Sequence, residues 1–170
     1  MESLFYPDPL IRLPLYAAFG LVAEILFTGI MDLVYPRFLS SWRVKQPFGK
    51  AAEVVGRDSR AVGYTFLWMI PIYMALILIE PLSQWVAGWS WFFRGLVYLG
   101  FLWIGEYISG VLIKKISGVN PWDYSYSKYS VGGYIRWDFA PLWFGFGLLV
   151  EFMSQKFVAL TPAIRAVLVP

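Results

Sequence analysis

Four carboxylates placed within or beside long apolar segments are the residues of this chain best suited to chemistry. They are three glutamates and one aspartate: Glu24, Glu106, Glu151 and Asp138. An ionised carboxylate at the centre of a bilayer costs roughly 2.5–3.5 kcal/mol on insertion scales. A chain that keeps such groups bonds them to partners, keeps them protonated, or uses them. The working hypothesis is a polar cavity where they bind a cation, a proton or an amine-bearing substrate.

Glu106 ranks first among these candidates because of its depth. It follows Arg94 by 12 residues and precedes Lys114 by 8. At about 1.5 Å per residue, its short side chain lies too far from either surface to reach it easily. Gly105 and Gly110 leave room beside it for a partner helix or a ligand. A neutral Glu106 bonded across helices is an equally good interpretation, so its role stays open.

Glu24 belongs to a polar stripe in the first apolar segment. Small or polar residues recur there at every fourth position: Gly20, Glu24, Thr28 and Asp32. Such a stripe must face protein or water, so it forms either a packing face or part of a binding site. Glu151 follows Gly147 by one helical turn, which again places a small residue beside an acid.

Asp138 precedes the last apolar segment, and we interpret it first as a helix cap that forms an ion pair with Arg136. An unusual aromatic and polar stretch comes before it: Pro121, Trp122, Asp123, Tyr124 and Ser125. The favoured interpretation is a rigid interfacial turn anchored by Trp122 and Tyr124. The alternative is a re-entrant or cavity-lining element, since non-helical backbone at membrane depth is tolerated only there.

Composition limits the classes of protein and of site. The chain has 170 residues, of which 59% are hydrophobic and 15% charged, against roughly 45–50% and 25% in soluble domains. It contains no cysteine and no histidine, which excludes disulfides, thiolate metal sites, imidazole haem ligation and a Ser-His-Asp triad. Glycine-rich nucleotide motifs are absent. We therefore expect no catalytic residue, no metal and no cofactor. The net charge of +3 is too small to indicate nucleic acid.

Four segments reach or approach the roughly 20 residues of a membrane-spanning helix: 14–35, 61–80, 91–113 and 139–157. Pro81 is predicted to end the second helix and Pro71 to bend it, and the tail after residue 158 is too interrupted by proline to span again. The predicted fold class is an all-α membrane protein. It is a single domain over residues 1–170, folded as an antiparallel bundle of four transmembrane helices.

Basic residues mark the predicted topology. The loops 36–60 and 114–137 hold ten of the fourteen lysines and arginines. The positive-inside rule therefore places both loops in the cytoplasm and both termini outside it. The apolar segment after the first 13 residues is too long for the core of a signal peptide and contains Glu24, so it is predicted to be an uncleaved helix.

Several blocks of sequence resemble a known family. They are YAAFGLVAEILFTG, ALILIEPL, GEYISGVLIKKISGVNPWDYS and GGYIRWDFAPLWFGFGLLVE, which span most of residues 15–152. They are similar to the small membrane proteins catalogued as "putative ABC-transporter type IV" permeases, which include small vertebrate transmembrane proteins. The most specific element is Pro121 to Ser125. The family pattern implies acidic positions at Glu24, Glu106, Asp138 and Glu151. The 36–60 loop is longer than expected for compact members.

Three functions fit these observations. The first is a multi-pass permease component with a carboxylate-lined cavity. By the resemblance, it would need a second copy and a separate ATP-binding subunit, so a homo-oligomer or a larger complex in the bilayer is expected. The second is a structural or accessory subunit whose acids bond across helices. The third is a lipid-acting membrane enzyme with paired carboxylates as acid and base.

Overall fold

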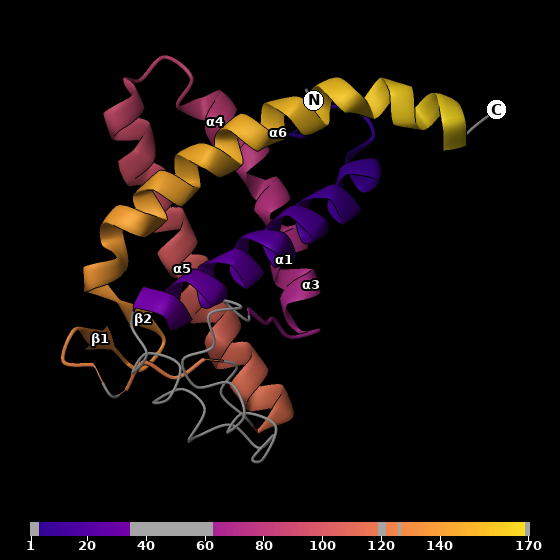
Figure 1. The fold of residues 1–170 in the computed structure, drawn as a ribbon. Coiled ribbons are helices and arrows are strands. Elements are labelled where there is room, and N and C mark those ends of the chain that lie inside the picture. Colours follow the sequence, from indigo (N-terminus) through magenta and orange to yellow (C-terminus); the bar gives the residue numbers. More distant parts are fainter. Residues whose placement is uncertain (1–3, 35–62, 119–121, 126, 169–170) are drawn as a thin grey trace.

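The computed structural model describes residues 4–34, 63–118, 122–125 and 127–168 and is mostly helical (Figure 1). The long helices are α1 (Pro9–Val34), α5 (Trp91–Ser117) and α6 (Ala140–Leu168). A shorter helical stretch consists of α3 (Met69–Met74), the 3-10 turn η1 (Ala75–Leu78) and α4 (Ile79–Trp85). Strand β1 (Ser130–Val131) pairs antiparallel with β2 (Ile135–Arg136), and the 3-10 turn η2 (Trp137–Phe139) leads into α6. The predicted basic loop 36–60 and Pro121 lie outside the described residues.

The helices pack in two principal pairs, α1 with α3 and α5 with α6. In Figure 1 the stretch from α3 to α4 rises to a turn and α5 descends from it, so that the two form an antiparallel hairpin. Helices α1 and α6 slant across this hairpin and also contact each other.

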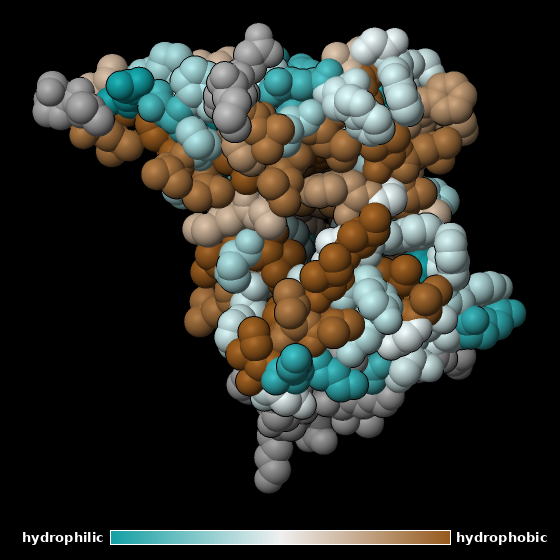
Figure 2. Space-filling view, turned by 180° about the vertical axis from the view of Figure 1, so that it is seen from behind, coloured by the Kyte–Doolittle hydropathy of each residue, from teal (hydrophilic) through white to brown (hydrophobic). Residues whose placement is uncertain are grey.

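Two described helical segments are long and apolar enough to cross a membrane, Pro9–Met31 and Trp91–Ser117. The stretch Met69–Trp85 is apolar but shorter. Large apolar side chains are exposed on the outside, among them Leu67, Trp91 and Ile104. Figure 2 shows that apolar residues cover the middle of one face, with hydrophilic residues toward its upper edge and lower end. An apolar surface of this extent is suited to apolar surroundings.

Glycines permit close contacts between helices. A Cβ atom at Gly20 would lie 2.1 Å from Cγ of Tyr73, and one at Gly147 would lie 2.5 Å from Cβ of Tyr98. The glycines next to Glu24 and Glu151 therefore do allow a neighbouring helix to approach. Gly105 differs, because in the described part of the chain nothing lies within 4 Å of its Cβ position.

The second predicted helix, 61–80, was wrong at both ends. Residues 63–66 are not helical, the helix begins at Met69, and it continues through Pro81 to Trp85. The 3-10 turn η1 precedes α4, so Pro81 falls in the first turn of α4. Proline is tolerated there because the N–H groups of a first turn have no partner within the helix.

Helix α6 also extends beyond its predicted end at residue 157 and passes through Pro162 to Leu168. Proline inside a helix costs about 3 kcal/mol or more, yet α6 continues, and residues on both sides of Pro162 make polar contacts. The Thr161 hydroxyl donates to the carbonyl of Phe157 at 2.8 Å, and Arg165 forms an ion pair with Asp8 at 2.8 Å. The local helix-breaking signal thus does not end α6. The other bounds differ less: α1 begins at Pro9 rather than 14, and α5 ends at Ser117 rather than 113.

Candidate functional site

Helix α1 directs Glu24 toward the segment that leads into α3. Its carboxylate accepts a hydrogen bond from the Thr65 hydroxyl and also interacts with the hydroxyl of Tyr73. One turn later, Thr28 accepts a hydrogen bond from the backbone N–H of Tyr64 at 2.9 Å. Gly20, Glu24 and Thr28 of the predicted polar stripe therefore face protein, which agrees with one interpretation of the sequence.

Glu106 lies on α5, on the side where the chain returns after that helix. Its Oε2 atom is buried and has no hydrogen-bond partner within the described part of the chain. The only side-chain partner recorded for its carboxyl group among these residues is the hydroxyl of Tyr124. A buried carboxyl oxygen without a donor is costly when the group is ionised, because burial removes its water.

Tyr73 interacts electrostatically with both of these acids. Its side chain is 9% exposed, and its ring packs against Gly20. Its hydroxyl interacts with Glu24 and lies within electrostatic range of Glu106. Five residues thus bring hydroxyl and carboxyl groups together here: Thr65 and Tyr73 with Glu24, and Tyr124 with Glu106. We call these five residues the hydroxyl–carboxyl row. Residue spacing alone did not single out Tyr73.

The stretch after α5 brings Tyr124 to this row. The Asp123 carboxylate accepts from the N–H of Ser125 at 2.9 Å, so the predicted tight turn is present. Nε1 of Trp122 donates to the carbonyl of Tyr134 at 3.0 Å, and both residues are buried. The N–H of Tyr124 donates to the carbonyl of Gly133 at 2.9 Å. These bonds hold Tyr124 inward.

The same stretch then runs back along α5. The ring of Tyr134 lies 5.3 Å from that of Tyr107, and Trp137 lies 4.6 Å from Trp103. Trp103 precedes Ser117, the last residue of α5, by 14 residues, which is about 21 Å along a helix. The segment therefore covers the second half of α5 and does not simply project from its end.

Glu151 and Asp138 lie elsewhere and have cationic partners. Oε1 of Glu151, on α6, lies 3.4 Å from Nε of Arg94 on α5. Nε of Arg136 donates to Asp138 at 2.9 Å, as proposed from their spacing. The hydrogen bond from Arg136 lowers the pKa of the Asp138 carboxyl. The structure thus brings Glu24 and Glu106 to one row and places the other two candidates outside it.

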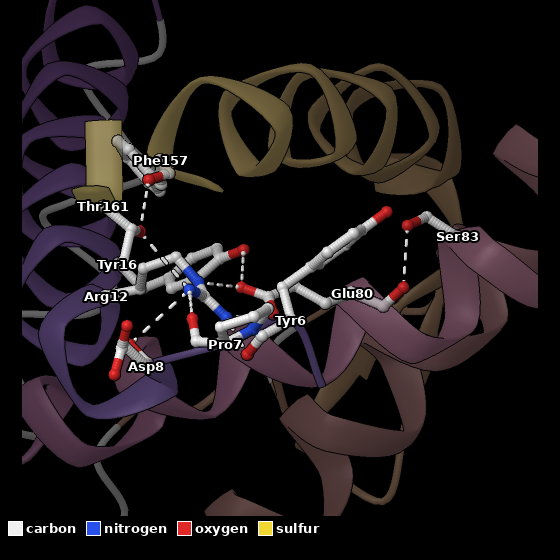
Figure 3. A network of polar contacts seen from close by, with 9 residues as sticks. All are labelled: Tyr6, Pro7, Asp8, Arg12, Tyr16, Glu80, Ser83, Phe157 and Thr161. Atoms are coloured by element: carbon white, nitrogen blue, oxygen red, sulfur yellow. Dashed lines mark hydrogen bonds and ion pairs between the residues drawn. The ribbon is translucent and has the colours of Figure 1, made fainter. Parts of the chain in front are cut away.

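A second buried network, shown in Figure 3, was missed by the sequence reasoning. Nε and Nη2 of Arg12 donate to the two carboxylate oxygens of Glu80, both at 2.7 Å, and both side chains are fully buried. Tyr16 donates to Oε1 of Glu80 at 3.1 Å, and Nη1 of Arg12 donates to Thr161 at 3.3 Å. The network ties α1 to α4 and α6. Its sequence signal is weak: a lone arginine and a lone glutamate at the ends of two apolar segments.

The partners of the acids therefore differ in kind. In the part of the chain that the structure describes, four carboxylates have an arginine partner: Asp8, Glu80, Asp138 and Glu151. Among the same described residues, Glu24 and Glu106 have hydroxyl partners and no cationic partner. No group of three or more acidic residues that could hold a metal ion occurs among the described residues.

A hollow of about 350 Å³ lies on the outer side of α5 and contains no carboxylate. Its lining residues are Gly100, Trp103, Ile104, Tyr107, Ile108 and Ile135. This apolar hollow is not the predicted polar cavity.

The apolar helices and exposed apolar surface indicate a helical integral membrane protein of transporter-like type. Residues 13–168 match the family described as "Putative ABC-transporter type IV", and the chain belongs to this family. The match includes all four candidate acids and Glu80, and it confirms the resemblance found in the sequence. No solved structure matches this fold.

Proposed function

We propose that this protein is the membrane component of a transporter in which Glu24 and Glu106 bind the positively charged group of the solute. One observation carries the proposal: these two carboxyls have hydroxyl partners, and Oε2 of Glu106 is buried without a partner among the described residues. Hydroxyl groups orient a carboxylate without neutralising it, so its charge stays available to a cation. Glu151 and Asp138 each already form an ion pair with an arginine, so we assign structural roles to them.

The proposed assembly follows from the family and the helix pattern. Helix α6 and the stretch Met69–Trp85 complete a bundle of four transmembrane helices with α1 and α5. The basic loops lie in the cytoplasm and the termini outside, as the positive-inside rule predicts. A separate ATP-binding subunit would contact these loops, and a second copy of the chain would complete the permease.

Cation binding is tested by thermal unfolding of the purified protein, followed by the fluorescence of its nine tryptophans. The probes are sodium, potassium and methylammonium chloride, with sucrose as a neutral comparison. A cation at ten times its Kd stabilises by about 1.4 kcal/mol, which corresponds to roughly 3–6 °C for a chain of this size.

The matched variants are Glu106→Gln and Asp138→Asn. Both remove one negative charge, but only Glu106 belongs to the hydroxyl–carboxyl row. We expect Glu106→Gln to lose the shift and Asp138→Asn to keep it. Equal shifts in the wild type and Glu106→Gln, or no shift with any of the three cations, would contradict the proposal.

A structural or accessory subunit is the second candidate function. The observation in its favour is that Glu24 already interacts with protein hydroxyls on the α3 side, as a residue that only holds helices together would. Such bonds contribute roughly 0.6–2 kcal/mol each in membranes. In this case Glu24→Gln and Glu106→Gln lower the Tm in the absence of any added cation, and the protein co-purifies with a stoichiometric partner.

A further inference from the structure

We infer that Arg94, held between α5 and α6 at one surface of the membrane, binds the phosphate group of a phospholipid. The inference goes beyond the proposed function, because it involves neither Glu24 nor Glu106 and does not require the protein to be a transporter. It names the chemical class of a second ligand and the residue that binds it.

Arg94 differs from the other arginines that the structure describes in the hydrogen bonds it makes. Those three donate to carboxylates at 2.7–2.9 Å: Arg12, Arg136 and Arg165. Nε of Arg94 is buried without a hydrogen bond among the described residues, and it lies 3.4 Å from Oε1 of Glu151. A guanidinium group also carries N–H donors on Nη1 and Nη2, and for Arg94 these remain available to a ligand.

The surroundings of Arg94 direct these donors outward. Its side chain is 28% exposed and that of Glu151 is 8% exposed, so a ligand from outside meets the cation before the carboxylate. Tyr98 lies one turn further along α5 and is fully buried, and a Cβ atom at Gly147 on α6 would lie 2.5 Å from its Cβ. The two helices are therefore closely packed on the inner side of Arg94, and Glu151 holds the guanidinium group at its buried Nε.

The position of Arg94 along α5 places it at the level of the lipid headgroups. It follows Trp91, the first residue of a helix long enough to span a membrane, by three residues, which is about 4.5 Å along the axis. Large aromatic side chains are exposed at this end of the hairpin: Trp85, Trp89, Trp91, Phe92 and Phe93. Because tryptophan is enriched where the hydrocarbon core meets the headgroups, a lipid phosphate beside these rings lies within reach of Arg94.

A phosphate diester fits these donors in charge and in shape. Its oxygens accept two parallel N–H bonds from the planar guanidinium group, an arrangement that the ammonium group of lysine does not offer. A free phosphate ion has the same oxygens, but it has no apolar part to pack against the exposed aromatic rings. The glycerol and acyl chains of a phospholipid supply that part, so we assign the site to the lipid.

The test is native mass spectrometry of the full chain in detergent, titrated with dioctanoyl phosphatidylglycerol. The measured quantity is the Kd of the first bound lipid. Dioctanoylglycerol has the same acyl chains without the phosphate and is expected to bind only at background level. An equal concentration of ammonium phosphate is expected to leave lipid binding unchanged. Equal binding of dioctanoylglycerol would overturn the role of the phosphate, and displacement by ammonium phosphate would overturn the assignment to a lipid.

The variants test Arg94 without leaving a buried charge unpaired. Arg94→Lys keeps a positive charge beside Glu151 but loses the planar donors, so the lipid should bind about tenfold more weakly. Arg94→Gln combined with Glu151→Gln removes both charges and should weaken binding roughly tenfold to a hundredfold.

Arg165→Gln is the matched control, because it removes an arginine that already forms an ion pair with Asp8. It is expected to leave the Kd unchanged. The inference is overturned by a wild-type Kd in either Arg94 variant, or by an equal loss of lipid binding in Arg165→Gln.

Discussion

Glu80→Gln is the substitution whose cost the structure predicts most directly. Arg12 and Glu80 are both 0% exposed, and their two hydrogen bonds measure 2.7 Å each. Glutamine has the same shape but removes the charge and replaces one acceptor oxygen with an amide donor. Arg12 then remains buried beside the carbonyls of Tyr6 and Pro7, at 3.0 and 2.6 Å, without a counter-charge.

The expected cost is about 3–5 kcal/mol, the usual penalty for breaking a buried ion pair by removing one partner. For a chain of this length that is a fall in Tm of roughly 6–20 °C. The assay is thermal unfolding in detergent followed by tryptophan fluorescence. Because the network ties α1 to α4 and α6, we expect the whole transition to move rather than a local one.

Asp8→Asn is the matched control. It removes one charge from the Asp8–Arg165 pair, whose distance is 2.8 Å but whose side chains are 32% and 57% exposed. Exposed pairs contribute about 0–1 kcal/mol, so its Tm should scarcely change. The reasoning is refuted if the two substitutions cost the same. It also predicts that Arg12→Met with Glu80→Met costs less than Glu80→Gln alone, because no charge is left buried.

Two further predictions concern packing and pH. Gly147→Ala is expected to destabilise the protein by about 1–3 kcal/mol because the new Cβ would lie 2.5 Å from Tyr98. Gly145→Ala should be neutral or stabilising because no described atom lies within 4 Å of its Cβ position. Equal Tm values for the two variants would refute the close contact. The pKa of Asp138 is lowered by Arg136, so its stabilising effect is present above the usual value of about 3.9 and is lost as pH falls through the lower folded value. Asp138→Asn should therefore remove part of the dependence of Tm on acid pH. Near pH 7 it should lower the free energy of unfolding by less than about 1 kcal/mol.

Much of the fold could be predicted from local patterns. Run length and composition identified α1 and α5, and Lys114 and Lys115 marked the end of α5 within a few residues. Gly118 adopts φ 75°, a conformation that suits glycine at the end of a helix. The proline signals misled, because their cost depends on where each proline falls in a turn and on contacts made far away. Pro81 lies in a first turn, and the residues around Pro162 are held by Arg12 and Asp8.

The candidate site could be predicted only in part. Depth and spacing selected Glu24 and Glu106, because burial follows from position along an apolar helix. Their hydrogen-bond partners could not be predicted from the sequence, because Thr65 is 41 residues from Glu24 and no local pattern relates the two. The choice between an arginine and a hydroxyl partner is also non-local, and it is this choice that separates Glu106 from Glu151.

The sequence by itself determined that this is an apolar helical chain of a known family with carboxylates inside its helices, because hydropathy, periodicity and motif are properties of neighbouring residues. The tertiary structure alone decided which charges are neutralised. Arg12 meets Glu80 across 68 residues and Thr161 across 149, whereas Glu24 and Glu106 meet hydroxyls. In a medium of low dielectric constant the partner of a carboxylate sets its charge, and a partner is fixed only when helices distant in the sequence pack together.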